Sequence, residues 1–261
     1  MSKLPAPDRF IDLSDYGRAL GNRIAKLLLY TKVSPKQVTM AFLIAGLIGV
    51  LCILIGLNWA AAFFLILKSI LDAADGTLAR LRNTPSYVGR YFDSISDILL
   101  NFLILLSVWF VTEASFILFV MAFIGIQLQG TLYNYYYAIV KQQRNGDTTS
   151  RVKEYKVPVA LAGETQKMVN YFFYTYKILY GFFDFIIYTV DRKAVHSEHF
   201  PNWYLTALSI FGLGFQLLLI SAMLVLNLHS FILPVLIFIS LLLPVFVFVR
   251  LFSDRKFSAT I

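Results

Sequence analysis

The sequence predicts an all-α integral membrane protein with six transmembrane helices, and three observations support this fold class. Hydrophobic residues make up 58% of the 261 residues and charged residues only 15%, whereas soluble domains are about half apolar and a quarter charged. The apolar residues gather in runs of roughly 20, the length at which a helix crosses a bilayer. Lys and Arg gather in the polar segments between alternate runs, as is typical of a multi-pass chain.

We expect the six transmembrane helices at about residues 38–56, 59–81, 91–111, 114–140, 204–226 and 230–249. The first two are separated by Gly56, Leu57 and Asn58, which form a natural turn between two uncharged runs. Pro234 and Pro244 should kink the last helix, which neighbouring helices in a membrane can tolerate.

Two further segments are predicted to lie at the membrane surface. In the segment 10–29, Arg and Lys face away from four apolar residues at helical spacing, which indicates an amphipathic surface helix. Those apolar residues are Leu20, Ile24, Leu27 and Leu28. The segment 168–190 is rich in Phe and Tyr but contains Lys177 and Asp184, whose burial across a bilayer would be costly. We therefore expect it to be an interfacial aromatic helix.

These features divide the chain into a cytoplasmic N-terminal segment (1–37), a six-helix domain (38–250) and a cytoplasmic tail (251–261). The domain includes a long cytoplasmic loop at about 141–203. All but one of the 23 Lys and Arg residues fall on one side of this layout, which predicts that both termini are cytoplasmic. The net charge of +8 follows from that asymmetry and requires no nucleic-acid partner.

Four aspartates stand where the second predicted helix leaves the membrane and the third begins: Asp72, Asp75, Asp93 and Asp97. Asp72 and Asp75 lie about 60° apart on a helix. Gly89, Asp93 and Asp97 recur every four residues and share one stripe. Two adjacent antiparallel helices can thus point four carboxylates into one cleft. Divalent cations with oxygen ligands, such as Mg²⁺, would relieve the repulsion among them.

The same helices offer space and a cation for a phosphate ligand. Gly76, Ala79 and Gly89 carry little bulk, so a flat ligand can approach the backbone, and Arg80 presents a fork of donors suited to phosphate oxygens. Taken singly, small residues more often serve helix packing and arginines more often anchor to headgroups. Those explanations do not account for four aspartates, three small residues and an arginine in register across two helices.

The segment 72–97 resembles the CDP-alcohol phosphotransferase family, whose signature is Asp-x2-Asp-Gly-x2-Ala-Arg-x8-Gly-x3-Asp-x3-Asp. The chain matches every fixed position. The resemblance implies an enzyme of phospholipid synthesis that moves a substituted phosphate from a CDP-linked donor to an alcohol hydroxyl and releases CMP. One of the two substrates would be a lipid, and a homodimer is the expected assembly.

The resemblance also implies roles for the signature residues. Two divalent ions, Mg²⁺ or Mn²⁺, would be ligated by Asp72, Asp75 and Asp93, with Asp97 sharing the second ion. The CDP group would be bound by Gly76, Ala79, Arg80 and Gly89. Asp97 would also act as the general base that accepts the proton of the attacking hydroxyl.

Several alternatives stay open at this stage. We favour CDP-diacylglycerol as the donor, and the alternative is transfer from CDP-choline or CDP-ethanolamine to diacylglycerol. An ion-coupled transporter would also place acids in a membrane, but nearer its midplane. A catalytically inactive relative would be expected to lose an aspartate.

Some polar residues outside the signature have two interpretations each. Lys68 would either neutralise the aspartate site or substrate phosphate, or pair with a glutamine or carbonyl inside the bundle. A phosphorylated acceptor could be bound by Arg90, Arg151 and Lys153, although ordinary cytoplasmic-side charges explain them as well. His196 and His199 are three residues apart, but we expect a solvated loop there rather than a metal site.

Overall fold

The computed structural model describes residues 10–143, 156–197 and 200–258, and its regular elements there are all helical. The α-helices are α1 (Arg18–Leu28), α2 (Pro35–Leu54), α3 (Asn58–Leu81), α4 (Tyr87–Thr112), α5 (Phe116–Gln143), α6 (Gln166–Val190), α7 (Asn202–Leu208), α8 (Leu213–Val225), α9 (His229–Ser240) and α10 (Leu243–Ser258). Short 3₁₀ turns are η2 (Leu13–Asp15), η3 (Arg192–His196) and η4 (Ser209–Phe211). The predicted all-α class is confirmed.

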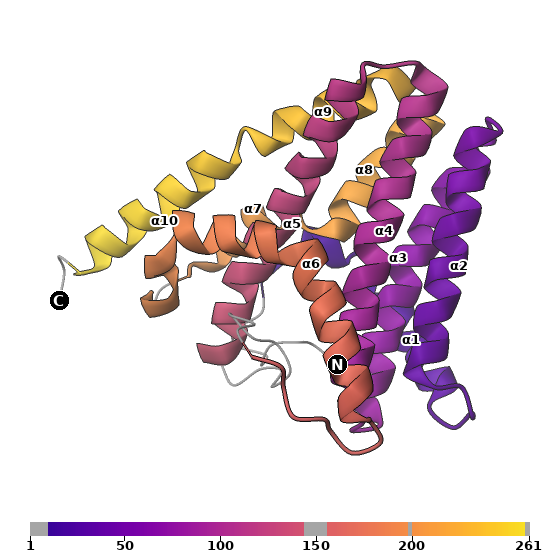
Figure 1. Cartoon of the computed structure of the whole chain (residues 1–261). Coiled ribbons are helices and arrows are strands. Elements are labelled where there is room, and N and C mark those ends of the chain that lie inside the picture. Colours follow the sequence, from indigo (N-terminus) through magenta and orange to yellow (C-terminus); the bar gives the residue numbers. More distant parts are fainter. Residues whose placement is uncertain (1–9, 144–155, 198–199, 259–261) are drawn as a thin grey trace.

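The long helices α2, α3 and α4 stand side by side, and α9 and α10 lead away from them toward the C-terminus (Figure 1). Four stretches of the described chain are long and apolar enough to cross a membrane: α2, α4, α5 and His229–Ser253. The bent pair Asn202–Phe211 and Leu213–Val225 makes a fifth if it is counted as one span. These apolar helices indicate a multi-pass membrane protein, with four or five spans supported rather than the six predicted.

The helix α3 differs from the other long helices because it carries charges. It is 24 residues long and contains Lys68, Asp72 and Asp75 in its interior, so its composition alone does not mark it as a membrane span. It nevertheless occupies the centre of the fold, where α1, α2 and α8 all pack against it. Two of the four signature aspartates, Asp72 and Asp75, are therefore held on a helix that other helices enclose on several sides.

The hairpin between α2 and α3 forms where the sequence predicted a turn. Ser34 begins α2 with a reciprocal cap, in which its hydroxyl accepts from the Gln37 N–H at 3.3 Å and its own N–H donates to Gln37 Oε1 at 2.7 Å. At the other end Gly56 adopts a φ of +75°, which a residue without a side chain takes without strain. The two helices thus run antiparallel, side by side.

The predicted helix at 204–226 is broken in the structure, where α7 with η4 and α8 meet at 53°. The N-terminal segment fills the break. The Leu13 N–H donates to Ser209 Oγ at 2.9 Å, and a Cβ built on Gly212 would come within 2.3 Å of the Ser14 side chain. Because this contact joins residues almost 200 positions apart, no local pattern in the sequence predicts the bend.

The last helix is interrupted as predicted, but at only one of its two prolines. It continues through Pro234 inside α9 and breaks between Ser240 and Leu243, just before Pro244. Proline has no N–H to donate to the carbonyl four residues earlier, and its ring crowds that turn. Despite the break, α10 continues the course of α9 (Figure 1), and the two form one apolar stretch, His229–Ser253.

The N-terminal helix α1 packs on α3 through small residues. A Cβ on Gly21 would meet Ala73 at 2.9 Å, and Ala25 is fully buried. Leu20 and Leu27, which the helical spacing grouped with the apolar face, are 49% and 76% exposed. The face that contacts the bundle is therefore defined by close approach of two backbones rather than by large apolar side chains.

We expect Gly214→Ala to lower the thermal unfolding midpoint of the detergent-solubilised protein. The added methyl would lie 1.7 Å from the Ser14 carbonyl oxygen, so the N-terminal segment must shift, at a cost of about 1–3 kcal/mol. Gly181→Ala is the matched control, because its new methyl would meet no atom closer than 3.5 Å. Equal midpoints for the two variants would show that the N-terminal segment is not docked at α8.

Candidate active site

A cleft of about 1210 Å³ opens between the N-terminal segment and helices α3, α4, α5 and α6. All eight signature residues line it: Asp72, Asp75, Gly76, Ala79, Arg80, Gly89, Asp93 and Asp97. The volume exceeds the roughly 300–1,000 Å³ typical of a site for one small ligand. The structure therefore brings the whole signature to one cavity with space for two substrates.

Three of the four aspartates form a cluster suited to a metal ion. Asp72, Asp75 and Asp93 each place a carboxylate oxygen within 4.8 Å of the others. Asp75 accepts a hydrogen bond from Thr39 Oγ1 at 2.6 Å. Asp93 Oδ1 is buried and has no hydrogen-bond partner among the described residues. A buried, unpartnered carboxylate oxygen is costly, and a hard divalent cation such as Mg²⁺ or Mn²⁺ would offset that cost.

Asp97 lies outside this cluster because it is paired with Lys68. The Lys68 ammonium forms an ion pair with Asp97 Oδ1 and lies 4.9 Å from the centre of the Phe42 ring. Lys68 is only 1% exposed, whereas Asp97 is 16% exposed and lines the cleft, so the ammonium is the shielded partner of the pair. Of the two interpretations of Lys68, the structure favours neutralisation of the aspartate site over pairing with a glutamine or carbonyl.

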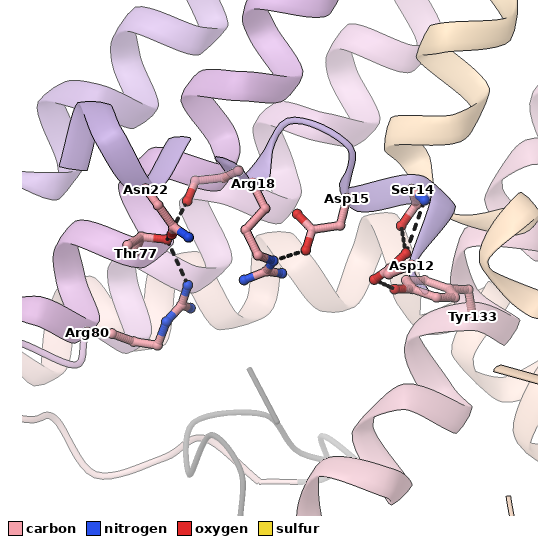
Figure 2. A network of polar contacts seen from close by, with 9 residues as sticks. Asp12, Ser14, Asp15, Arg18, Asn22, Thr77, Arg80 and Tyr133 are labelled. Atoms are coloured by element: carbon pink, nitrogen blue, oxygen red, sulfur yellow. Dashed lines mark hydrogen bonds and ion pairs between the residues drawn. The ribbon is translucent and has the colours of Figure 1, made fainter. Parts of the chain in front are cut away.

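Arg80 reaches the cleft from the last turns of α3, supported by the N-terminal helix. Its Nη2 donates to Thr77 Oγ1 at 3.1 Å, and the Thr77 hydroxyl lies 3.2 Å from Asn22 Oδ1 on α1. Figure 2 shows this contact next to the ion pair between Arg18 and Asp15. Two arginines from different helices therefore line the same part of the cleft, where they suit a phosphate-bearing ligand.

The N-terminus of α4 is held by a carboxylate that the sequence analysis did not single out. Glu164 Oε1 accepts from Ser86 Oγ at 2.6 Å and from the Val88 N–H at 2.8 Å, and Oε2 accepts from the Tyr87 N–H at 3.2 Å. Ser86 Oγ in turn accepts a hydrogen bond from the Gly89 N–H at 2.8 Å and so caps α4. Because Glu164 is more than 70 residues from the start of α4 in sequence, only the folded chain shows the connection.

A polar stripe on α5 was also missed. Gln127, Thr131 and Asn134 all line the cleft, and their spacing of four and three residues places them on one helical face. The signal was present in the sequence, since polar residues at helical spacing inside a predicted span are costly unless they face a cavity or a partner. The prediction of a plain transmembrane helix at 114–140 overlooked it.

The other residues with two interpretations are only partly placed. Arg90 lines the cleft, and its guanidinium lies 4.6 Å from the centre of the Tyr91 ring. Arg151 and Lys153 lie outside the described residues, as does His199. A phosphate site built from all three basic residues, and a metal site built from the two histidines, therefore stay untested.

Comparison with known proteins adds two findings. The family model described as CDP-alcohol phosphatidyltransferase matches residues 32–190, which include every helix that carries the signature. The chain is also 40% identical over 80 residues to the bifunctional IPC transferase and DIPP synthase of Thermococcus kodakarensis. That alignment covers 31% of this chain and 18% of the relative, so the relative is much the longer protein and only a part of it is comparable.

We expect Lys68→Met to destabilise the protein mainly when no divalent metal is present. Removing one partner of a buried ion pair costs about 3–5 kcal/mol, and a metal bound at the aspartates would compensate for the lost positive charge. Mn²⁺ should therefore raise the unfolding midpoint of Lys68→Met more than that of the wild type, relative to EDTA. Lys177→Met removes an exposed lysine and serves as control. Equal metal-induced shifts in all three proteins would contradict the assignment.

We expect Glu164→Gln to lower stability near neutral pH but not in acid. Partial burial acts to raise the pKa of Glu164, but its hydrogen bonds from Ser86 and three backbone N–H groups outweigh burial and lower that pKa below its ordinary value of 4.5. Because the folded pKa is the lower one, the stabilisation is present above about pH 4.5 and is lost as pH falls through the folded value.

The check is the unfolding midpoint of wild type and Glu164→Gln from neutral pH down to about pH 3.5. The gap between the two proteins should narrow as the pH falls. Glu113→Gln, at an exposed loop position, should show no comparable pH-dependent gap. A gap between wild type and Glu164→Gln that is constant across this range would overturn the charge-based account of the cap.

Proposed function

Because the chain belongs to the CDP-alcohol phosphatidyltransferase family, we propose that it transfers a phosphatidyl group from CDP-diacylglycerol to the hydroxyl of a small polar alcohol and releases CMP. The family uses a CDP-alcohol donor and an alcohol acceptor; the choice of donor is our proposal. The observation that carries it is the convergence of all eight signature residues on one cleft.

The donor's CDP group fits the part of the cleft between α3 and the start of α4. Gly76 leaves space there, since a Cβ at that position would meet only the Arg80 guanidinium, at 3.4 Å or more. Ala79 and Gly89 add little bulk, so a flat base can lie against both helices. Arg80 would hold the diphosphate through paired donors.

The aspartates would hold two divalent ions, with Asp72, Asp75 and Asp93 binding the first and Asp97 sharing the second. Ions bound there would neutralise the diphosphate and favour departure of CMP. The chain's own contribution is to fix the carboxylates on two antiparallel helices. Positioning and charge neutralisation account for most of the rate in phosphoryl transfer.

Asp97 is the proposed general base. A carboxylate paired with an ammonium is in its ionised form, which is the form that accepts a proton. In the proposed step the acceptor's O–H proton passes to Asp97 as its oxygen bonds to the β-phosphorus. The bond between that phosphorus and the oxygen of CMP breaks, and CMP leaves with the electron pair.

The lining of the cleft supports a polar acceptor and a lipid donor. Among the described residues that line it, Ile126 and Leu213 are the only large aliphatic ones. A diacylglycerol acceptor would have to bring an almost wholly apolar molecule to Asp97 past a lining made mostly of polar and charged residues. A CDP-diacylglycerol donor would place its charged headgroup in the cleft and leave its acyl chains in the bilayer. Transfer from CDP-choline or CDP-ethanolamine to diacylglycerol is the alternative.

The membrane arrangement that we propose has six spans: the four apolar stretches, the bent pair α7–α8, and α3. At 1.5 Å per residue, the 24 residues of α3 are long enough to cross. One of its charges, Lys68, is paired with Asp97 inside the bundle, and metal ions would compensate Asp72 and Asp75. We place α1 and α6 at the cytoplasmic interface, together with the cleft and both termini, and we expect a homodimer.

The test is CMP release by the purified protein with Mn²⁺ or Mg²⁺, offering CDP-diacylglycerol and CDP-ethanolamine separately with panels of acceptors. Release should require CDP-diacylglycerol, and Asp97→Asn should lower kcat by about 10²–10⁴-fold, the usual contribution of a general base. Glu113→Gln, far from the cleft, should match the wild type. Release from CDP-ethanolamine alone would select the alternative branch. If the protein neither released CMP in the presence of metal nor bound either donor, the proposed enzymatic function would be wrong.

A further inference from the structure

We propose that the polar stripe of α5, formed by Gln127, Thr131 and Asn134, binds the acceptor alcohol, and that this acceptor is a small uncharged molecule with several hydroxyl groups. The proposal rests on the function proposed above, because it assigns the second substrate of the same cleft. It follows from the burial, bonding and charge of residues that the signature does not include.

The stripe faces open space within the cleft. Gln127, Thr131 and Asn134 line the cavity together with Gly130, which lies between them on the same helical face. A Cβ built on Gly130 would meet no atom within 4 Å, so the cavity is wide beside this glycine. Asn101, one turn beyond Asp97 on α4, adds a fourth polar side chain to the same cavity.

Two members of the stripe carry buried polar atoms without a partner. Gln127 is 3% exposed and Thr131 is 6% exposed. Within the part of the chain that the structure describes, neither Gln127 Nε2 nor Thr131 Oγ1 has a hydrogen-bond partner. An unsatisfied buried polar group costs about 1–3 kcal/mol. Both atoms belong to residues that line the cavity, so a ligand there can satisfy them.

Two nearby glutamines show that buried amides without a hydrogen-bond partner are not a general property of the bundle. Gln129, on another face of α5, donates to the Leu236 carbonyl at 3.0 Å and accepts from Gln216 Nε2 at 3.0 Å. Gln216 also donates to the Phe211 carbonyl at 3.1 Å. Gln129 and Gln216 are thus bonded to the protein, even though Gln216 also lines the cleft, whereas Gln127 keeps a donor available.

The charges around the stripe favour an uncharged acceptor. On α5 the nearest lysine that lines the cleft is Lys141, ten residues beyond Thr131, which is about 15 Å along the helix. Lys68 is already paired with Asp97. The arginines that line the cleft lie on α1, at the end of α3 and at the start of α4, where the CDP group is proposed to bind. A phosphate or carboxylate at Gln127 would instead share the cavity with the carboxylate of Asp97. Hydroxyl groups both donate and accept hydrogen bonds, so they can pair with the amide of Gln127 and the hydroxyl of Thr131.

The geometry also places the acceptor correctly for the reaction. Asp97 and Asn101 share one face of α4, and α4 packs against α5. An alcohol held by the stripe from α5 can present one of its hydroxyl groups to Asp97 while its others bond to Gln127 and Thr131. The CDP group, held by α3 and the start of α4, occupies the cytoplasmic part of the same cleft.

The experiment measures CMP release from CDP-diacylglycerol by the full-length protein, with neutral polyols, their phosphorylated counterparts and amino alcohols as acceptors. Neutral polyols should be used best. Thr131→Val should raise the acceptor KM about 3- to 10-fold, as loss of one hydrogen bond predicts, with kcat and donor KM little changed. Thr131→Ser should restore the wild-type KM. Thr112→Val, at the far end of α4, is the matched control.

The unfolding midpoint distinguishes a role of Thr131 in acceptor binding from a role in the stability of the fold. Thr131→Val removes a hydroxyl that bonds to nothing described in the protein, so it should fold and melt no lower than the wild type. A lower midpoint, an unchanged acceptor KM, or preference for phosphorylated or amino acceptors would overturn this inference while leaving the proposed reaction intact. No CMP release with any acceptor would remove the proposed function, and this inference with it.

Discussion

The gathering of four carboxylates from two helices, α3 and α4, at one cleft is the constraint on which the rest of the structure depends. A carboxylate in a low-dielectric interior is costly unless a positive charge or several donors compensate it. The chain supplies a lysine for Asp97 and a threonine for Asp75, and it gathers the remaining oxygens at spacings that suit a cation. The helix that carries two of these acids is accordingly enclosed on several sides, with α1, α2 and α8 packed around it.

The surrounding elements hold these two helices in place. On one side the small residues of α1 let its backbone approach α3 closely, and on another the carboxyl group of Glu164 fixes the first turn of α4. Fixed helices keep the aspartates at set distances, and catalysis by positioning depends on such rigidity. In the cavity beside them, the amides and the hydroxyl group of the polar stripe on α5 would then orient the proposed uncharged acceptor.

The features that could be predicted from the sequence are those encoded by local spacing. Helical periodicity placed Asp93 and Asp97 on one stripe, and the apolar runs predicted the helices α2, α4 and α5 within a few residues. The pairing of Lys68 joins residues 29 positions apart, and the bend at Gly212 depends on the distant Ser14, so neither leaves a local pattern. The polar stripe on α5 is different, because its spacing was visible and its meaning became clear only when the opposite wall of the cleft was known.

The docking of the N-terminal segment has a consequence for biosynthesis. Residues near the start of the chain contribute Asp12, Ser14 and Arg18 to the wall of the cleft, but they are held there by Tyr133 and by the break before α8. Translation makes this wall well before its anchoring points at Tyr133 and Ser209. This wall of the cleft therefore cannot be anchored fully until Ser209 has been made, and a nascent chain that ends before it would carry the complete signature without a complete site.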